Sequence, residues 1–390
     1  MNKILQVAKL NKAKSYLSKA WIIGLFFCFF LVSNNTFARK KTDLVLEFAK
    51  EQIAQKFYQP AISTINSYLE SHKNDTVALY WKAFCFYKLK NFQAANENYT
   101  LLLKLHPKCY AAYVDMGNML VLDKKFDDAL PYYNKAVKMN DSDINLFNSR
   151  GMCYYYADKF ELAIKDFRRV IKLDPNNYIA YNNIGSATYN NQNIAEASVV
   201  DLKLAEAQFN KSLELKPDFE LANRNRGIVR YHLDKIDEAY NDLLYATQLD
   251  PNDESAQYYL GKVLVKQKNY TIAIQFFDNA INLTNYKSEY YLDRGMCKLE
   301  LENFKSARSD IYKSMQLTNE RAYAYYQIAR TYAAEGEKNN TFTYLREAKK
   351  AGLFNDNRYF GYIAKDKYFV GWAKDEEFKD FMYTLKFGKN

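Results

Sequence analysis

Half of the chain's 12 glycines fall at a single phase of a 34-residue period. They form two runs with strict 34-residue spacing, joined by one 42-residue step: Gly117, Gly151 and Gly185, then Gly227, Gly261 and Gly295. Self-similarity at a fixed period of this length is the signature of an array of structural repeats. Such a chain uses one supersecondary unit many times, and each copy packs mainly on its two neighbours.

Alignment on these glycines brings three further columns into register. Alanine recurs in the first column: Ala95, Ala129, Ala163, Ala205, Ala239, Ala273 and Ala307. Large apolar residues form the second: Tyr99, Tyr133, Phe167, Phe209, Leu243, Phe277 and Ile311. Proline, or a polar residue in its place, forms the third: Pro107, Asp141, Pro175, Pro217, Pro251, Asn285 and Asn319.

The columns have a mechanical explanation in a helical hairpin. Glycine on the first helix and alanine on the second let the two helix axes approach closely, because larger side chains would push them apart. Proline ends the second helix, since it lacks an N–H and disfavours helical geometry in the residue before it. Only 6 prolines and 12 glycines occur in 390 residues, so we expect few long loops and an all-α chain.

The clearest unit contains Phe147-x2-Arg150-Gly151-x2-Tyr154, followed by Ala163-x3-Phe167 and Pro175. This unit resembles the tetratricopeptide repeat (TPR), whose pattern is W-x2-L-G-x2-Y, then A-x3-F, then P. The resemblance extends over eight units, which begin at Thr76, Tyr110, Ile144, Tyr178, Glu220, Glu254, Ser288 and Ala322. It implies a right-handed α-solenoid of about eight to nine helical hairpins, closed by a C-terminal capping helix. The units depart from the pattern where arginine replaces the usual aliphatic residue before glycine, at Arg150, Arg226 and Arg294.

The chain divides into four parts on this interpretation. Residues 1–38 are a signal peptide, 39–75 a degenerate N-terminal hairpin, 76–353 the array of eight repeats, and 354–390 a C-terminal cap. The unit that begins at Tyr178 is eight residues too long, within 190–204. This insertion is either a lengthened second helix that projects about 12 Å further and specifies a partner, or a change tolerated at the edge of a loop.

The N-terminus has the features of an export signal. Five lysines and no acidic residue fall within residues 1–38, and an apolar run of 12 residues occupies 21–32. That run suits a signal sequence and is shorter than the about 20 residues that a membrane-spanning helix needs. Thr36 and Ala38 supply the small residues of a cleavage site. We expect an exported protein, in the periplasm of a Gram-negative bacterium or secreted; the alternative is an N-terminal anchor that is not removed.

The remaining sequence contains few residue patterns that are typical of catalysis, metal binding or nucleic-acid binding. Outside residues 1–38 it holds 50 basic and 45 acidic residues without a basic block, so we expect no nucleic-acid partner. The three histidines, His72, His106 and His232, lie in different units and form no metal-binding motif. Three cysteines, Cys85, Cys153 and Cys297, share one interior repeat position, which predicts buried, unpaired thiols. We therefore expect no catalytic residue, no metal and no cofactor, and a protein that is not an enzyme.

The resemblance places a binding surface on the inner, concave side of the array, which the solvent side of each first helix lines. Carried over position by position, its candidate peptide-binding residues are Asn118, Asn148, Tyr155, Tyr156, Asn182, Tyr189, Arg224, Tyr231 and Tyr258, with Tyr80, Phe84, Tyr87, His232 and Lys262 on the same surface. Asparagine can pair with the backbone of an extended peptide and tyrosine provides rigid contact area. This combination favours a moderately polar, uncharged segment.

The sequence thus predicts a non-enzymatic scaffold that binds a protein or an extended peptide outside the cytoplasm. The family's carboxylate clamp, which uses Lys and Asn at set first-helix positions over three repeats, is not matched, since Val114 and Asn118 stand where the Lys–Asn pair would begin. The alternative function is a structural or assembly component that self-associates as a homo-oligomer, or an envelope factor tethered to the membrane.

Overall fold

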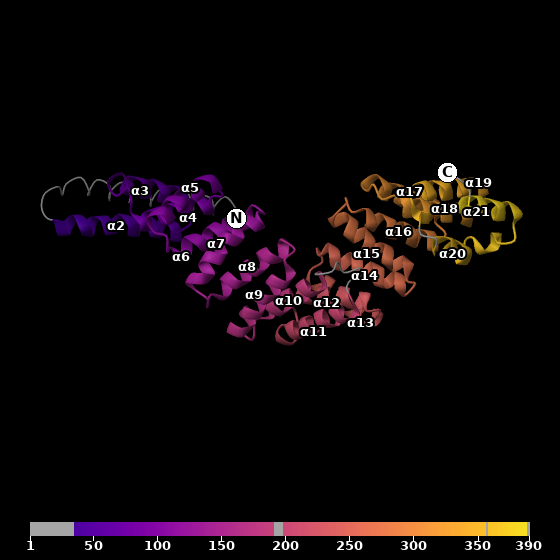
Figure 1. The fold of residues 1–390 in the computed structure, drawn as a ribbon, viewed down its shortest axis with the longest axis horizontal. Coiled ribbons are helices and arrows are strands. Elements are labelled where there is room, and N and C mark those ends of the chain that lie inside the picture. The colour runs from indigo at the N-terminus through magenta and orange to yellow at the C-terminus, as the bar shows by residue number, and fades with distance from the viewer. Residues whose placement is uncertain (1–34, 191–197, 356–357, 388–390) are drawn as a thin grey trace, which may run out of the picture. The chain divides into compact units, whose positions relative to one another are not determined.

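The computed structural model describes residues 35–190, 198–355 and 358–387 of the chain (Figure 1). All regular structure in these residues is helical, and the helices follow one another as antiparallel hairpins. The chain separates into two compact units, Met1–Asn140 and Asp141–Asn390. The predicted all-α array of consecutive hairpins is therefore confirmed.

The first unit contains three hairpins. Their helices are α2 (Asn35–Ala54), α3 (Tyr58–Ser71), α4 (Thr76–Lys88), α5 (Phe92–Leu105), α6 (Tyr110–Leu122) and α7 (Phe126–Met139). The α2–α3 hairpin corresponds to the degenerate N-terminal pair, and Ala61 on α3 is fully buried in its core.

The second unit contains six hairpins and a C-terminal segment. The hairpin helices are α8 (Ile144–Tyr156), α9 (Phe160–Leu173), α10 (Tyr178–Asn190), α11 (Val199–Leu215), α12 (Glu220–His232), α13 (Ile236–Leu249), α14 (Glu254–Lys266), α15 (Tyr270–Leu283), α16 (Ser288–Glu300), α17 (Phe304–Leu317), α18 (Ala322–Ala334) and α19 (Lys338–Lys350). The segment that follows comprises η2 (Leu353–Asn355), α20 (Arg358–Lys365), η3 (Val370–Trp372) and α21 (Glu376–Phe387).

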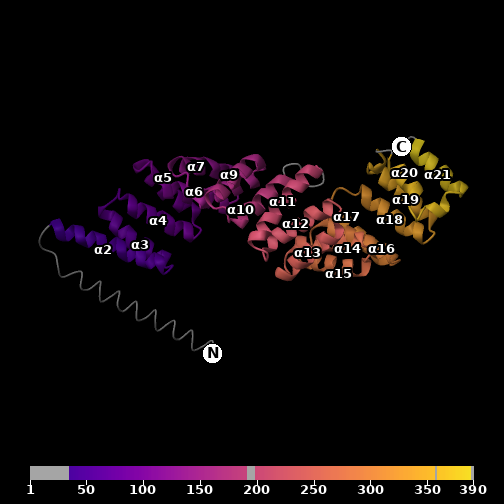
Figure 2. The same ribbon diagram turned by 90° about the horizontal axis from the view of Figure 1, so that it is seen from below.

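Within each unit, each hairpin stacks on the next in chain order. Within the second unit a first helix packs on the second helix of its own hairpin, and that second helix packs on the first helix of the following one (Figure 2). All eight first helices from α4 to α18 begin at the residue where the sequence predicts a repeat to begin. The repeat register read from four columns of residues is thus confirmed.

The glycine and large-apolar columns contact each other directly. A Cβ atom built on Gly151 would lie 2.7 Å from the Phe167 ring, and one on Gly117 would lie 2.5 Å from the Tyr133 ring. Gly185, Gly227, Gly261 and Gly295 meet the corresponding residue of the second helix in the same way. Each glycine therefore marks the place where a large side chain of the second helix lies flat against the first helix.

The tight turn between the two helices depends on one residue with left-handed backbone geometry. Lys90 and Lys268 have φ of 59° and 60°, and equivalent residues have positive φ in the other hairpins whose turns the structure describes. Lys90 N donates to the Tyr87 carbonyl at 3.0 Å, and Asn91 N donates to the Phe86 carbonyl at 2.9 Å. These bonds satisfy carbonyl groups that the end of a helix would otherwise leave unpaired.

The arginines that depart from the TPR pattern bridge the two helices of a hairpin. In each case the guanidinium makes a bidentate contact with the aspartate 16 residues later: Arg150 with Asp166, Arg226 with Asp242, and Arg294 with Asp310. The intervening units have Met116, Ile184 and Leu260 at the arginine position. Ionic and apolar hairpin contacts therefore alternate along this part of the array.

Of the two forms expected for the lengthened repeat, the structure does not show a second helix longer by two turns. Helix α11 has 17 residues, whereas α9 and α13 have 14. Three extra residues extend a helix by about 4.5 Å instead of about 12 Å. The other extra residues lie in the connection between α10 and α11, of which 191–197 lie outside the described residues.

The C-terminal segment covers the last hairpin with aromatic side chains. Phe342 of α19 stacks on Phe381 of α21 with ring centroids 4.1 Å apart, and Phe369 and Phe378 pack beside them. This contact buries an apolar face that no further repeat covers, as expected of a cap.

The predicted signal peptide lies almost wholly in residues 1–34, outside the described part of the chain. Helix α2 begins at Asn35 and continues through the predicted cleavage position at Ala38. Among the described residues, no helix combines the length and the apolar character needed to cross a membrane.

Candidate functional site

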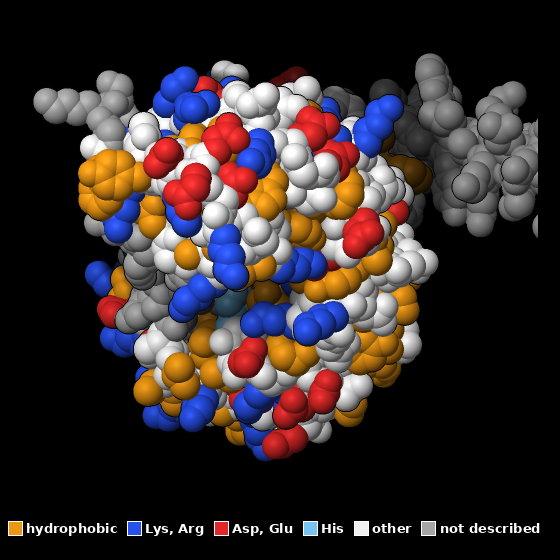
Figure 3. All heavy atoms as spheres, turned by 90° about the vertical axis from the view of Figure 1, so that its right-hand side faces the viewer, with side chains coloured by type: hydrophobic (Ala, Val, Ile, Leu, Met, Phe, Trp, Pro, Cys, Tyr) orange, Lys and Arg blue, Asp and Glu red, His pale blue; other side chains and the backbone are white. Residues whose placement is uncertain are grey.

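The predicted binding residues of the second unit lie on four successive first helices. We call the following set the first-helix strip: Asn148, Tyr155 and Tyr156 of α8, Asn182 and Tyr189 of α10, Arg224, Tyr231 and His232 of α12, and Tyr258, Tyr259 and Lys262 of α14. Lys and Arg side chains gather around a hollow in the face seen from the side of α20 and α21 (Figure 3). The positions of the strip residues follow from the contacts that their side chains make.

Hydrogen bonds join neighbouring first helices along the strip. Asn190 Nδ2 donates to Tyr155 Oη at 2.6 Å, and Tyr258 Oη donates to Asp293 Oδ2 of α16 at 2.6 Å. In both pairs the partners are 35 residues apart, which is one repeat plus one residue. The register of adjacent first helices therefore brings each of these side chains beside the next position of the following repeat.

The helices α10 and α12 are joined in the same way across the insertion. Asn225 Nδ2 donates to Asn182 Oδ1 at 3.0 Å and lies 3.2 Å from Ser186 Oγ. The separation of 43 residues between Asn182 and Asn225 equals the usual 35 plus the eight inserted residues. The insertion thus leaves the contact between first helices unchanged.

Tyrosine rings surround one ammonium group between α12 and α14. Lys262 Nζ lies 5.4 Å from the ring centroids of Tyr231 and Tyr258, and 5.6 Å from that of Tyr259. Such contacts are attractive because the face of an aromatic ring carries partial negative charge. Burial, with the nearby Asp293 carboxylate, raises the pKa of Tyr231 to about 12, so this phenol stays protonated.

His232 lies at the edge of this cluster. Its ring centroid is 6.0 Å from that of Tyr259, and its Nε2 atom is buried without a hydrogen-bond partner. Burial, and then the positive charge of Lys262, lower the pKa of His232. The imidazole is therefore neutral at pH 7 and adds no charge to the strip.

Arg224 is held in place by its neighbours. Its Nη1 atom lies 2.9 Å from Asp253 Oδ2, and its Nε and Nη2 atoms each lie 3.1 Å from Asn225 Oδ1. Asp253 also caps helix α14, since its other carboxylate oxygen accepts from Ser255 N and Ala256 N. The charge of Arg224 is thus already compensated within the unit.

The structure separates the predicted residues by exposure. Tyr156 is 53% exposed, whereas Asn182 and Tyr258 are only 4% and 8% exposed, so the last two support the surface instead of facing solvent. Asn118 belongs to the first unit, where it accepts a hydrogen bond from Tyr133 at 2.7 Å. Asn148 is half-buried, and its Oδ1 atom lacks a hydrogen-bond partner.

Two polar residues, one in the strip and one beside it, were not predicted from the sequence. Tyr259 and Asn225 each follow a residue at the predicted first-helix position, and both contact the neighbouring first helix. The 35-residue spacing, with the eight inserted residues added, could have identified Asn225 as the partner of Asn182.

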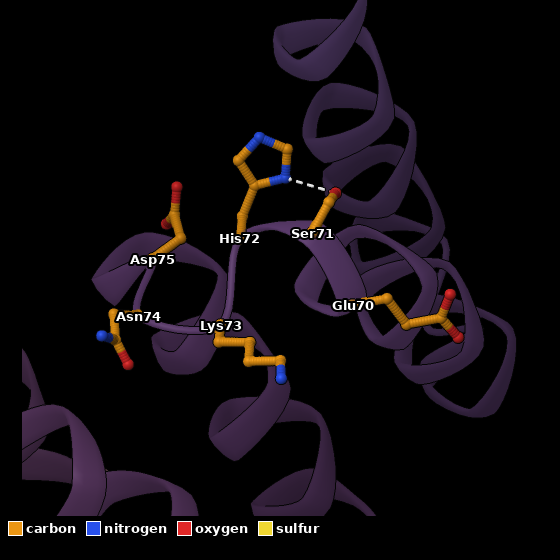
Figure 4. Close-up of a pocket in the computed structure, with 6 residues that line it drawn as sticks. All are labelled: Glu70, Ser71, His72, Lys73, Asn74 and Asp75. Carbon is orange, nitrogen blue, oxygen red and sulfur yellow. Dashed lines mark hydrogen bonds between the residues drawn. The ribbon is translucent and has the colours of Figure 1, made fainter.

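A polar recess at the α3–α4 connection has the residue types of a hydrolytic site but not the arrangement. Its volume is about 540 Å³, and Glu70, Ser71, His72, Lys73, Asn74 and Asp75 line it. Figure 4 shows that these side chains point in different directions, although Ser71 Oγ and His72 Nδ1 lie 2.8 Å apart. Asp75 caps α4 through Val77 N and Ala78 N instead of orienting the histidine. The recess therefore contains no Ser–His–Asp relay.

The described part of the chain contains no assembled metal-binding site and no assembled reactive-thiol site. No group of three or more His, Cys, Asp or Glu residues there is placed to hold a metal ion. Cys85, Cys153 and Cys297 are buried and form no disulfide bond, as their shared repeat position predicts. Burial raises the pKa of the Cys85 and Cys297 thiols to about 12, so neither forms the reactive thiolate near pH 7.

Family models of the tetratricopeptide repeat match residues 144–177, 85–144 and 225–288. The chain contains tetratricopeptide repeats. The matched TPR segments include α8, α14 and the part of α12 from residue 225 on, which carry most of the first-helix strip. Proteins with such repeats act as protein-interaction scaffolds.

Relatives and solved structures support the same assignment of repeats. The chain is 27% identical over 220 residues to the DnaJ homolog subfamily C member 7 homolog of Dictyostelium discoideum, covering 53% of this chain and 40% of that protein. It is 23% identical over 311 residues to human tetratricopeptide repeat protein 6, covering 79% and 59%. The chain thus spans about half the length of these curated relatives.

A crystal structure of a tetratricopeptide repeat protein from Parabacteroides merdae has the same fold. It matches with a TM-score of 0.51 at 18% identity, over 66% of this chain and 98% of that one. This similarity concerns the fold alone.

Proposed function

We propose that the second unit is a non-catalytic scaffold that binds an extended segment of another protein along the first-helix strip. The observation that carries this proposal is the continuity of the strip. Four successive TPR first helices present tyrosine, asparagine and one lysine side chain to a common face, and hydrogen bonds between neighbouring helices fix their positions. A preorganised surface of this kind loses little entropy when a partner binds.

The chemistry of the strip suits a peptide backbone. The exposed ring of Tyr156 and the half-buried rings of Tyr155 and Tyr231 offer amphipathic contact area. Asn148 Oδ1 has no hydrogen-bond partner, so a side-chain rotation towards a peptide N–H would satisfy an atom that the free protein leaves unpaired.

Substitution of Tyr156 and Asn148 tests the proposal. Tyr156→Ala with Asn148→Ala should reduce capture of partner proteins from an extract roughly tenfold, on the order of 1–2 kcal/mol for the loss of one contact ring and one hydrogen bond. The matched control is Tyr286→Ala, because Tyr286 is 70% exposed in the connection between α15 and α16, away from the strip. Capture that the double substitution leaves unchanged, with helicity preserved, would refute the use of this face.

We further propose that the protein acts outside the cytoplasm, in the periplasm of a Gram-negative bacterium or as a secreted protein. The support is the lysine-rich start, the 12-residue apolar run and the small residues Thr36 and Ala38. Mass spectrometry of the protein isolated from its native host tests this: a chain that begins near Arg39 is expected, and a chain that retains residues 1–34 contradicts cleavage.

A further inference from the structure

The four first helices that carry the strip contain few acidic residues. Helices α8, α10, α12 and α14 have 13 residues each, and their only carboxylates are Glu220 and Glu254. Each of these is the first residue of its helix, where a negative charge is favoured by the helix dipole. Positions further along these helices offer cations, amides and tyrosines but no negative charge.

The cations of these helices differ in what balances them. Arg150 and Arg226 pair with aspartates of their own second helices, and Arg224 pairs with Asp253. Lys266 has an exposed contact of 3.3 Å with Asp234. Lys262 is the exception: within the described residues no carboxylate oxygen lies within 4 Å of its ammonium group, and its neighbours are the three tyrosine rings.

The acidic groups nearest to Lys262 belong to α16. Asp293 accepts a hydrogen bond of 2.6 Å from the Tyr258 hydroxyl, and burial raises the pKa of this carboxyl group. Glu289 stands one turn earlier on the same helix. Asp293 weakens the field of Lys262 but leaves its ammonium without a direct ion-pair partner.

We propose that the protein segment bound by the first-helix strip carries an acidic side chain, whose carboxylate pairs with Lys262 beside the Tyr259 ring. This inference rests on the proposed function and specifies the chemistry of the partner. Charge complementarity favours it, because a carboxylate meets a free ammonium group and no opposing carboxylate from α8, α10, α12 or α14. It replaces the uncharged segment that the residue types alone suggested.

Within the described helices α8, α10, α12 and α14, Lys262 is the one cation without a carboxylate partner, and this distinguishes the bound segment from a nucleic acid. A phosphate backbone requires cations repeated along its path, and binding then weakens steeply as salt rises. Here Arg224 already pairs with Asp253, and Lys266 contacts Asp234. One uncompensated ammonium among tyrosines suits one carboxylate in an otherwise polar segment.

Selection from a displayed library of random 12-residue peptides tests the proposal with the 390-residue chain. We expect enrichment of peptides that contain Asp or Glu and whose binding Tyr156→Ala weakens. For one selected peptide, measured by fluorescence anisotropy, replacing its acidic residue by the matching amide should weaken binding roughly three- to tenfold. The same replacement should have no effect on the Lys262→Gln variant, and Lys262→Arg should restore the difference.

The control is Lys172→Gln, because Lys172 is an exposed lysine near the end of the second helix α9. This variant should bind like the unaltered chain. Thermal midpoints of all variants show whether the strip still folds.

Different results separate the two proposals. Selected peptides without an acidic preference, whose binding depends on Tyr156 but not on Lys262, overturn the acidic partner and leave the scaffold function standing. A library that yields no binder sensitive to Tyr156→Ala overturns both. Lys262-dependent binding of a thymidine oligonucleotide, with a steep loss of affinity on raising salt, overturns the peptide assignment in favour of a nucleic acid.

Discussion

At the scale of single residues, the repeated glycines are the best predicted feature of the chain. Each was expected at a close contact between two helices, and each lies against the large apolar residue of the second helix. The solvent exposure of individual side chains was harder to predict. Asn182 and Tyr258 occupy first-helix positions that face solvent in an isolated hairpin, but side chains of the next first helix cover them. A pattern within one repeat contains no information on that neighbour.

Substituting one of these glycines should destabilise the second unit. Gly151→Leu inserts a side chain where even a Cβ atom would lie 2.7 Å from Phe167, so we expect a loss of about 1–3 kcal/mol in unfolding free energy. Gly361→Ala is the control, because the site has open space in helix α20 and alanine favours helix by about 0.5–1 kcal/mol. Urea unfolding of both variants measures the difference, and a neutral Gly151→Leu would contradict the close helix contact.

The cysteines give a second prediction at this scale. Cys85, Cys153 and Cys297 are buried, whereas Cys109 is partly exposed. The folded chain should therefore react rapidly with a thiol reagent at Cys109 and slowly at the other three sites, because a buried thiol is shielded and resists ionisation. Peptide mapping after a short exposure identifies the labelled sites. Equal labelling of Cys85 and Cys109 would show that the repeat interior is open.

At the scale of the helices, the repeat register predicted where each hairpin begins because every column of residues reports the same phase. The arginine column is visible in the sequence as a departure from the TPR pattern, but that pattern does not indicate which residue the arginines contact. An aspartate stands 16 residues after Arg150, Arg226 and Arg294, and this spacing links the two helices of a hairpin. The position of the lengthened repeat was predicted, but the sequence left open whether the eight residues lengthen the second helix or the connection before it, and helix α11 takes up three of them.

The arginine–aspartate pair of the α8–α9 hairpin should be strongly coupled. Asp166→Ala leaves Arg150 without its bidentate partner in a site where both side chains are largely buried, so we expect a loss of about 3–5 kcal/mol. The pair Arg150→Leu with Asp166→Phe copies Leu260 and Phe276 of the repeat that begins at Glu254. It should regain most of this loss. Chemical denaturation of Arg150→Leu, Asp166→Phe and the double variant measures the coupling between the two positions, and additive effects would argue against a specific ion pair.

At the scale of the whole molecule, the polar groups buried between repeats make stability depend on pH in two opposite ways. Lys235 and Arg230 hold the Glu206 carboxylate, and the pKa of Glu206 is lowered although burial opposes this. Its contribution to stability is present above the pKa of the unfolded chain and is lost as pH falls through the lower folded value. Asp115 of the first unit behaves in the opposite sense. Burial raises its pKa despite hydrogen bonds of 3.0 Å from both Tyr80 and Tyr99.

The raised pKa of Asp115 means that acid favours the folded form at this site. Protonation is easier in the folded than in the unfolded chain, so the penalty for burying the charged carboxylate falls as pH decreases through the folded pKa. The variant Asp115→Asn keeps an oxygen acceptor for the two tyrosines and removes the charge. Its thermal midpoint should therefore exceed that of the unaltered chain at pH 8, and the advantage should shrink on acidification towards pH 4. A difference that grows on acidification would mean that the charged carboxylate stabilises the first unit, and that the tyrosine hydroxyls outweigh its burial.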